Sequence, residues 1–173
     1  GRVIASIGSF NTKKTYVNLG DDHENFGYVL EYNNRNSDGF KKIDNSSKNT
    51  GFEGNDYVAK FRVNTNADAK VFQSLMAKVQ YSEDLANETY LGLTDADYAN
   101  NAYRRYVGSN EDYIESEHKQ IMLTHLIKPS TNFSITTKAY KNDFSRNWYK
   151  LDALKLGASK VSINNILTNP STF

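Results

Sequence analysis

The segment that decides the fold reads Asp56-Tyr57-Val58-Ala59-Lys60-Phe61-Arg62-Val63-Asn64. Its odd-numbered positions from Tyr57 to Val63 are aromatic or aliphatic, whereas Lys60 and Arg62 lie between them. Successive side chains of a β-strand point to opposite faces of the sheet. The segment therefore predicts a strand with one apolar face and one largely polar face.

The same period-two alternation recurs along the chain and predicts an all-β fold of about seven strands. We expect these strands to form an antiparallel meander. The last run is the least regular. The expected strands are Arg2–Ser9, Lys14–Gly20, Phe26–Asn34, Asp56–Asn64, Val71–Ser82, Tyr113–Ile127 and Phe133–Asp143.

The connections between these runs alternate in length. Short polar turns are expected at 21–25, 65–69 and 128–132, and long segments at 35–55, 83–112 and from 144 onward. Only the connection Phe10–Lys13 is short on the long-loop side. Compact domains seldom contain connections as long as 83–112 unless they are functional. Short turns at one end and long loops at the other are typical of an outer-membrane β-barrel.

Alternation alone does not separate a membrane barrel from a soluble β-sandwich, because polar mid-strand residues suit bulk water as well as a barrel interior. Two alternatives therefore stay open. One is a soluble sandwich that serves as a carbohydrate-binding or adhesin-like module, and the other is a passive porin-like barrel.

Composition narrows the possible partners. The 173 residues include 12 Tyr and 9 Phe, which argues against disorder. A net charge of +1 leaves no basic excess for a nucleic-acid partner. Cysteine is absent, so disulfides and Cys-ligated zinc are excluded. No apolar run approaches the ~20 residues of a membrane helix. No signal peptide is visible at Gly1, and both ends look cut rather than finished.

Two short helices are expected inside the long loops. Thr94-Asp95-Ala96-Asp97 resembles a capping box and predicts a helical turn through Asp95–Ala99. The segment Ser162–Leu167, before Pro170, predicts a second one.

Metal binding and catalysis have little support in the sequence. His118 and His125 lie on one expected strand at an odd separation, which places them on opposite faces, and His23 lies in a turn. Asp95 and Asp97 offer oxygen ligands for Ca²⁺ but lack the EF-hand spacing, which favours a solvated acidic loop. No nucleophile–base or phosphate-binding motif is present, so we expect neither an enzyme nor a cofactor.

Two clusters in the long loops combine cations with aromatic rings. The first is Tyr103-Arg104-Arg105-Tyr106, and the second is Arg146 with Trp148 and Tyr149. Guanidinium groups bind carboxylates bidentately and stack on flat ligands. The alternative is that these arginines bind loop carboxylates and hold the loops together. Their position on one expected rim favours a ligand-binding role for the set.

Several segments resemble the barrel of TonB-dependent outer-membrane receptors, particularly the ferric-dicitrate type. The resemblance extends over nearly the whole chain. It is carried by Glu88–Tyr98, Tyr103–Tyr106, Asn36–Phe40, Thr50–Phe52 and Tyr140–Lys150.

This resemblance implies that residues 1–173 form the N-terminal part of a ~22-stranded transmembrane barrel, incomplete and with long extracellular loops. The plug that contacts TonB is absent from the chain. The implied location is the bacterial outer membrane, in contact with its lipid, and the implied function is binding and import of a ferric chelate such as ferric citrate or a siderophore. Arg104, Arg105 and Arg146 would contact ligand carboxylates, and Tyr103, Tyr106 and Trp148 would supply flat contact area.

Overall fold

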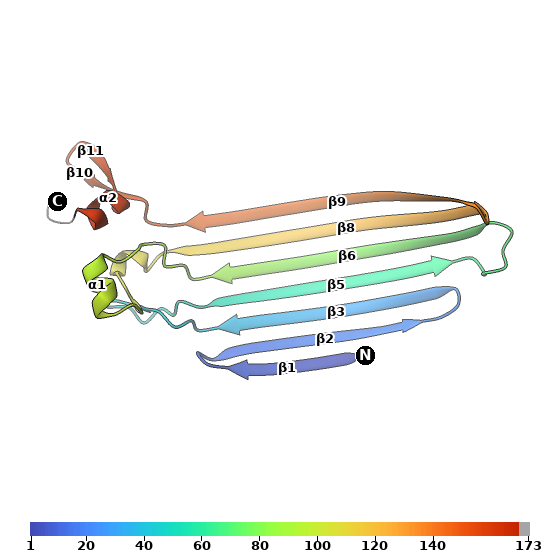
Figure 1. The fold of residues 1–173 in the computed structure, drawn as a ribbon, viewed down its shortest axis with the longest axis horizontal. Coiled ribbons are helices and arrows are strands. Elements are labelled where there is room, and N and C mark those ends of the chain that lie inside the picture. The colour runs from blue at the N-terminus through green and yellow to red at the C-terminus, as the bar shows by residue number, and fades with distance from the viewer. Residues whose placement is uncertain (170–173) are drawn as a thin grey trace.

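The computed structural model describes residues 1–169, apart from the side chain of Leu156. Its main element is one antiparallel sheet of seven strands in the order β1-β2-β3-β5-β6-β8-β9 (Figure 1). Each strand pairs with the next one of the sheet, as in a meander. The seven strands are β1 Arg2–Gly8, β2 Thr12–Asp22, β3 Phe26–Ser37, β5 Phe52–Asn64, β6 Phe72–Ala86, β8 Tyr113–Ser130 and β9 Phe133–Tyr149.

Long connections gather at one end of the sheet, as the sequence predicts (Figure 1). That end carries β4 (Lys42–Ile43), α1 (Asp95–Asn100), β7 (Arg104–Arg105) and the turn η1 (Val107–Ser109). Beyond β9 follow β10 (Ala153–Leu156), β11 (Ser159–Ser162) and α2 (Ile163–Thr168). The opposite end has only short turns.

Both expected helices are confirmed. Thr94 caps α1 by accepting a hydrogen bond from the Asp97 amide, and Ser162 caps α2 by accepting one from the Asn165 amide. Such caps satisfy backbone donors that a helix N-terminus leaves without partners. Pro170, the expected stop of α2, lies outside the described residues.

All seven expected strands are present, but most are longer than their alternation indicates. β9 continues to Tyr149 because its backbone stays paired with β8, with Tyr113 opposite Tyr149. A ladder of backbone hydrogen bonds extends wherever a neighbouring strand is present, whether or not side-chain polarity alternates. Arg146 and Trp148 therefore lie on a strand and not in a loop.

One face of the sheet carries an apolar band. Opposite residues in the register of neighbouring strands lie on the same face, so the pairing of Leu30 with Ala59 and of Ala59 with Val79 continues a row across the sheet. The band extends from Tyr57 to Val63 along β5, about 20 Å at 3.3 Å per residue. Its members in the central strands are Leu19, Tyr28, Leu30, Ala59, Phe61, Val63, Leu75, Ala77, Val79, Ile121 and Leu123.

A row of tyrosines borders this band on the side of the long loops. The ring centroids of Tyr32 and Tyr57 are 5.0 Å apart, and those of Tyr57 and Tyr81 are 6.2 Å apart. Beyond the row the same face becomes polar, with Asn55 and Glu83 opposite each other. The row matches the aromatic girdles that flank the lipid-facing band of outer-membrane barrels.

The opposite face, which we call the polar face, is tied together by side-chain hydrogen bonds between strands. Glu31 accepts hydrogen bonds from Tyr16 and Asn18 of β2 and lies 3.7 Å from the ammonium of Lys60. Further towards the loops, Arg35 bridges to Asp56 at 2.6 Å and to Asp84 at 2.5 Å.

Gly54 makes the second of these bridges possible. It lies on β5 between Arg35 on β3 and Asp84 on β6. A Cβ atom at Gly54 would come within 2.3 Å of an Asp84 carboxylate oxygen. A side chain of any size at this position therefore conflicts with the bridge.

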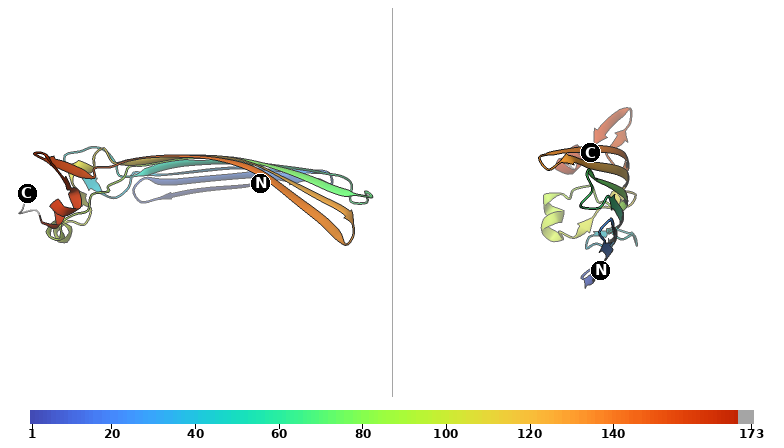
Figure 2. Two further views of the ribbon diagram at one scale, coloured as in Figure 1. Left: turned by 90° about the horizontal axis from the view of Figure 1, so that it is seen from above. Right: turned by 90° about the vertical axis from the view of Figure 1, so that its right-hand side faces the viewer.

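No second layer covers the apolar face within residues 1–169 (Figure 2). Among the described residues, the buried hydrophobic side chains are Ile43, Leu91 and Ile163, and all three belong to the long-loop end. On the sheet, Phe61 and Ile121 are 52% and 55% exposed. None of the helices in the described part of the chain is sufficiently long and apolar to cross a bilayer.

Candidate functional site

The connections 38–51 and 87–112 form one folded unit at the long-loop end, which we call the loop cap. Its two parts are joined by the parallel pair β4–β7. The Lys42 amide donates to the Tyr103 carbonyl and the Asp44 amide to the Arg105 carbonyl, both at 2.9 Å. The side chains of Tyr103, Arg104, Arg105 and Tyr106 are thus positioned by a contact between loops that are far apart in the sequence.

A buried carboxylate anchors the cap to the end of β9. Asp112 is 1% exposed, and its two oxygens accept hydrogen bonds from the backbone amides of Tyr90 at 3.1 Å and Leu151 at 3.0 Å. Leu91 of the cap is also buried, and its side chain lies close to Gly108. Because charge-assisted hydrogen bonds compensate the burial of a carboxylate, Asp112 fixes where the cap sits on the sheet.

Arg104 is committed to carboxylates of the cap itself. Its Nε lies 2.9 Å from Asp44 and its Nη1 lies 2.7 Å from Asp97. The hydrogen bond with Asp44 raises the pKa of Arg104, so the side chain stays charged. Asp97 also accepts a hydrogen bond of 2.6 Å from the Tyr106 hydroxyl, and this bond chiefly lowers the pKa of the Asp97 carboxyl. Arg104 and Tyr106 therefore act as internal ties of the cap.

Arg105 and Tyr103 are differently placed. Arg105 donates only to backbone carbonyls, those of Ala102 at 2.9 Å and Arg104 at 2.5 Å, and makes no ion pair within residues 1–169. Tyr103 is 61% exposed, with its ring edge-on to Phe40. Arg105 and Tyr103 can therefore still contact a ligand, whereas the guanidinium of Arg104 is already bound to Asp44 and Asp97.

Arg146 and Trp148 form a second cluster at the loop end of β9. The Arg146 guanidinium lies 5.9 Å from the Trp148 ring, and Tyr90 of the cap meets that ring edge-on at 5.2 Å. The ammonium of Lys150 lies 3.8 Å from the Tyr90 ring and 4.6 Å from the Trp148 ring. Trp148 thus links the strand to the cap through cation–π and aromatic contacts.

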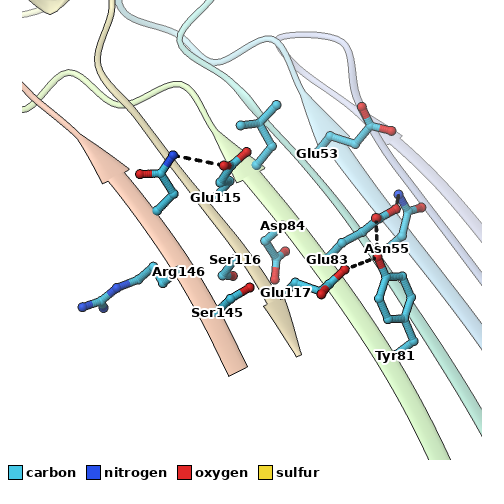
Figure 3. Close-up of a pocket in the computed structure, with 12 residues that line it drawn as sticks. Glu53, Asn55, Tyr81, Glu83, Asp84, Glu115, Ser116, Glu117, Ser145 and Arg146 are labelled. Atoms are coloured by element: carbon cyan, nitrogen blue, oxygen red, sulfur yellow. Dashed lines mark hydrogen bonds between the residues drawn. The ribbon is translucent and has the colours of Figure 1, made fainter. Parts of the chain in front are cut away.

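The sheet register places Arg146 on the polar face. It lies opposite Ser116, which lies opposite Asp84, in the same row as Arg35. Figure 3 shows the Arg146 side chain turned away from the acidic residues around it. In the described part of the chain its guanidinium has no carboxylate within ion-pair distance.

A hollow of about 600 Å³ lies beyond the tyrosine row, and Arg146 is among the residues that line it (Figure 3). The Tyr81 hydroxyl lies 3.0 Å from both Glu83 and Glu117 there. Glu53 and Glu115 add two further carboxylates to its lining. The acidic side chains of the lining outnumber its single guanidinium, Arg146, so the hollow does not favour the anionic ferric chelate that the sequence resemblance implies.

The sequence-predicted site is thus divided by the structure. All six predicted residues lie at the long-loop end, but Arg104 and Tyr106 are tied to Asp97, whereas Arg105, Tyr103, Arg146 and Trp148 retain free contact surface. No local signal in the sequence reveals the partners Asp44, Tyr90 and Asp112, because each of their contacts joins segments far apart along the chain.

No metal site emerges among residues 1–169, since no group of three or more His, Cys, Asp or Glu side chains is placed to hold an ion. Comparisons with protein-family models, with characterised proteins and with solved structures gave no match to this chain. Inferences about function therefore depend on the geometry of the chain and on its sequence motifs.

Proposed function

We propose that this chain forms part of the wall of an outer-membrane transport barrel that binds and imports ferric chelates. The observation that carries the proposal is the uncovered apolar face of a seven-stranded sheet. Phe61, Val63 and Ile121 are each more than half exposed, and the described residues supply no layer to cover them. Exposed apolar patches of this extent need a partner. Lipid acyl chains meet the need, because an aromatic row borders the band as in known barrels.

The polar face fits the interior of such a barrel. Its bridges from Glu31 to β2 and β5, and from Arg35 to β5 and β6, satisfy charged groups across neighbouring strands. Strands that alternate polar and apolar residues, with short turns at one end and long loops at the other, are the pattern of outer-membrane barrels.

A soluble β-sandwich requires a second sheet over the apolar face. Within residues 1–169 the other two sheets have only two strands each and belong to the long-loop end. The sandwich reading is therefore less well supported than the barrel. A passive porin-like barrel shares the same wall, so only ligand binding and energy-dependent import separate it from a receptor.

The ligand we propose is an anionic, oxygen-rich ferric chelate bound at the long-loop end. Within residues 1–169, Arg146 and Arg105 have no carboxylate partner, and Trp148 and Tyr103 offer flat contact area. Arg104 and Tyr106 take a supporting role, since they hold the cap in shape. TonB, through a plug outside this chain, is the proposed energy-coupling partner, and membrane lipid is the partner of the apolar face.

Ferric citrate binding to the purified protein in detergent tests this function. Arg146→Ala is expected to raise the Kd at least about tenfold, the size of one charge-assisted hydrogen bond. Lys138→Ala is the matched control, because Lys138 shares the strand and face of Arg146 but lies near the short-turn end. Equal Kd values for Arg146→Ala and the unmodified protein would reject the assigned role, and absence of binding in the unmodified protein would reject ferric citrate as ligand.

A further inference from the structure

Lys41 is a second cation of the loop cap that bridges its two parts. It precedes β4, and its ammonium donates a 3.0 Å hydrogen bond to the hydroxyl of Thr89 in the other part. Thr50 fixes its backbone, since the Thr50 hydroxyl accepts from the Lys41 amide at 3.1 Å and donates to the Lys41 carbonyl at 2.9 Å. Lys41 is half-buried and held in place, unlike a freely mobile surface lysine.

The charge of Lys41 is poorly compensated. Burial lowers its pKa, and the nearby guanidinium of Arg105 lowers it further, while Glu88 acts in the opposite direction. Glu88 nevertheless forms no ion pair with Lys41 or Arg105 in the described part of the chain. The pairing of β4 with β7, in which Ile43 lies opposite Arg105, holds Lys41 and Arg105 in neighbouring positions. A bound anion would relieve the repulsion between these two cations.

Arg105 has donors to spare for such an anion. Its Nη1 is used by the carbonyls of Ala102 and Arg104, whereas no hydrogen bond from its Nε or Nη2 is formed within residues 1–169. The Phe40 ring lies 5.9 Å from the Lys41 ammonium and meets the ring of the exposed Tyr103 edge-on. Donors on a guanidinium suit the oxygens of a carboxylate or phosphate.

We infer that Lys41 and Arg105, with the Thr89 hydroxyl, form a binding site for an oxyanion between the two parts of the loop cap. The site is distinct from the Arg146–Trp148 cluster, which lies on β9. This inference rests on the proposed function only for the identity of the oxyanion, which would be a carboxylate of the ferric chelate. The pair of cations itself does not depend on iron transport.

Titration calorimetry on the purified protein in detergent tests the inference with two probes, iron-free citrate and inorganic phosphate. Lys41→Gln and Arg105→Gln remove one charge each and keep a hydrogen-bond donor. Lys42→Gln is the matched control, because Lys42 is the exposed neighbour on β4. We expect each of the first two variants to raise the citrate Kd at least about tenfold, with Lys42→Gln unchanged. Lys41→Arg keeps the positive charge, so we expect this variant to bind citrate like the unmodified protein.

Two results would overturn the site. One is citrate binding that is equal in all variants, and the other is an unmodified protein that binds neither citrate nor phosphate. Phosphate binding that depends on Lys41 and Arg105 while citrate does not bind keeps the oxyanion site but assigns it to phosphate, such as a lipid headgroup. If neither variant changes the binding of ferric citrate, citrate or phosphate, both this inference and the ligand role of Arg105 are refuted, and the proposed function then rests on Arg146 alone. If the unmodified protein does not bind ferric citrate but its citrate binding depends on Lys41, the oxyanion site stands and ferric citrate is rejected as the ligand of the proposed function.

Discussion

Side chains in the middle of the sheet, such as Phe61 and Ile121, are more than half exposed, whereas Asp112 in the loop cap is almost completely buried. The sheet gains its order from backbone pairing along seven strands and from bridges such as Arg35–Asp84. The cap gains its order from a small interior, a buried carboxylate and the ties of Arg104. The sheet therefore depends on its surroundings to cover its apolar side chains, whereas the cap buries its own.

Under the proposed function, this difference assigns a separate role to each region. A wall that alternates polar and apolar side chains separates two solvents, lipid and water, and does not need a core of its own. A binding surface, by contrast, needs side chains held in fixed positions. The cap provides this rigidity because its two loops are paired through β4 and β7 and anchored by Asp112.

The largest expected effect is on the sheet. Ala59 lies on the apolar face and its neighbour Val58 on the polar face. In lipid vesicles, Ala59→Arg is expected to reduce the free energy of unfolding by about 2–4 kcal/mol, the cost of Arg at the middle of a lipid-facing strand. Val58→Arg should cost less than about 1 kcal/mol. Equal losses at the two positions in chemical unfolding would contradict the difference between the faces.

The next largest effect is on the cap. Asp112→Ala leaves the amides of Tyr90 and Leu151 without their acceptor, so we expect it to reduce the stability of the cap by about 2–3 kcal/mol. Hydrogen exchange at these two amides measures the loss. Glu111→Ala is the control, because Glu111 is exposed and, within residues 1–169, its side chain accepts a hydrogen bond from Asn110 alone. Exchange that is the same in both variants would show that Asp112 does not anchor the cap.

A smaller effect is expected on the polar face. Gly54→Ala places a methyl group against the Arg35–Asp84 bridge and should destabilise the protein by roughly 1 kcal/mol, since both side chains are partly exposed. Gly92→Ala is the matched control, because a Cβ there meets no atom within 4 Å. The free energy of unfolding in detergent should fall for the first variant alone. A loss of stability of the same size in both variants would show that the Arg35–Asp84 bridge does not require glycine at position 54.

The smallest effect concerns acid. The folded cap lowers the pKa of Asp97, so its contribution is fully present above the unfolded value of about 3.9 and is lost as pH falls through the folded pKa. Fluorescence of Trp148, the single tryptophan, reports contact with Tyr90 of the cap. We expect a constant signal from pH 8 to about 5 and a change only below about 4.

Tyr106→Phe provides the sharper form of this acid test. It removes the hydrogen bond that lowers the pKa of Asp97 most, so the fluorescence transition should move to higher pH. Tyr98→Phe, at an exposed position of α1, should leave the transition in place. If Tyr106→Phe does not shift the transition, protonation of Asp97 is not its cause.

The sequence predicts the sheet far better than the cap. Period-two alternation is a local signal, so the runs around Tyr57 and Val79 indicated their strands directly. Capping residues such as Thr94 likewise located a helix. Contacts in the cap are not local: Arg104 meets Asp44 across 60 residues of chain. The arginine cluster was visible in the sequence, but which arginines are already bound follows only from the fold.

Side-chain environment along β5 tests the central claim, that the apolar face meets lipid, most directly. The chain has no cysteine, so single cysteines at positions 58–63 can each carry a spin label without background in this region. In lipid vesicles, labels at Ala59, Phe61 and Val63 should be accessible to oxygen from the bilayer and protected from a water-soluble nickel complex, with the opposite preference at Val58, Lys60 and Arg62. A period-two pattern of this phase is the predicted result. Protection of the odd-numbered positions from both reagents would mean that protein covers the apolar face, and would contradict the account.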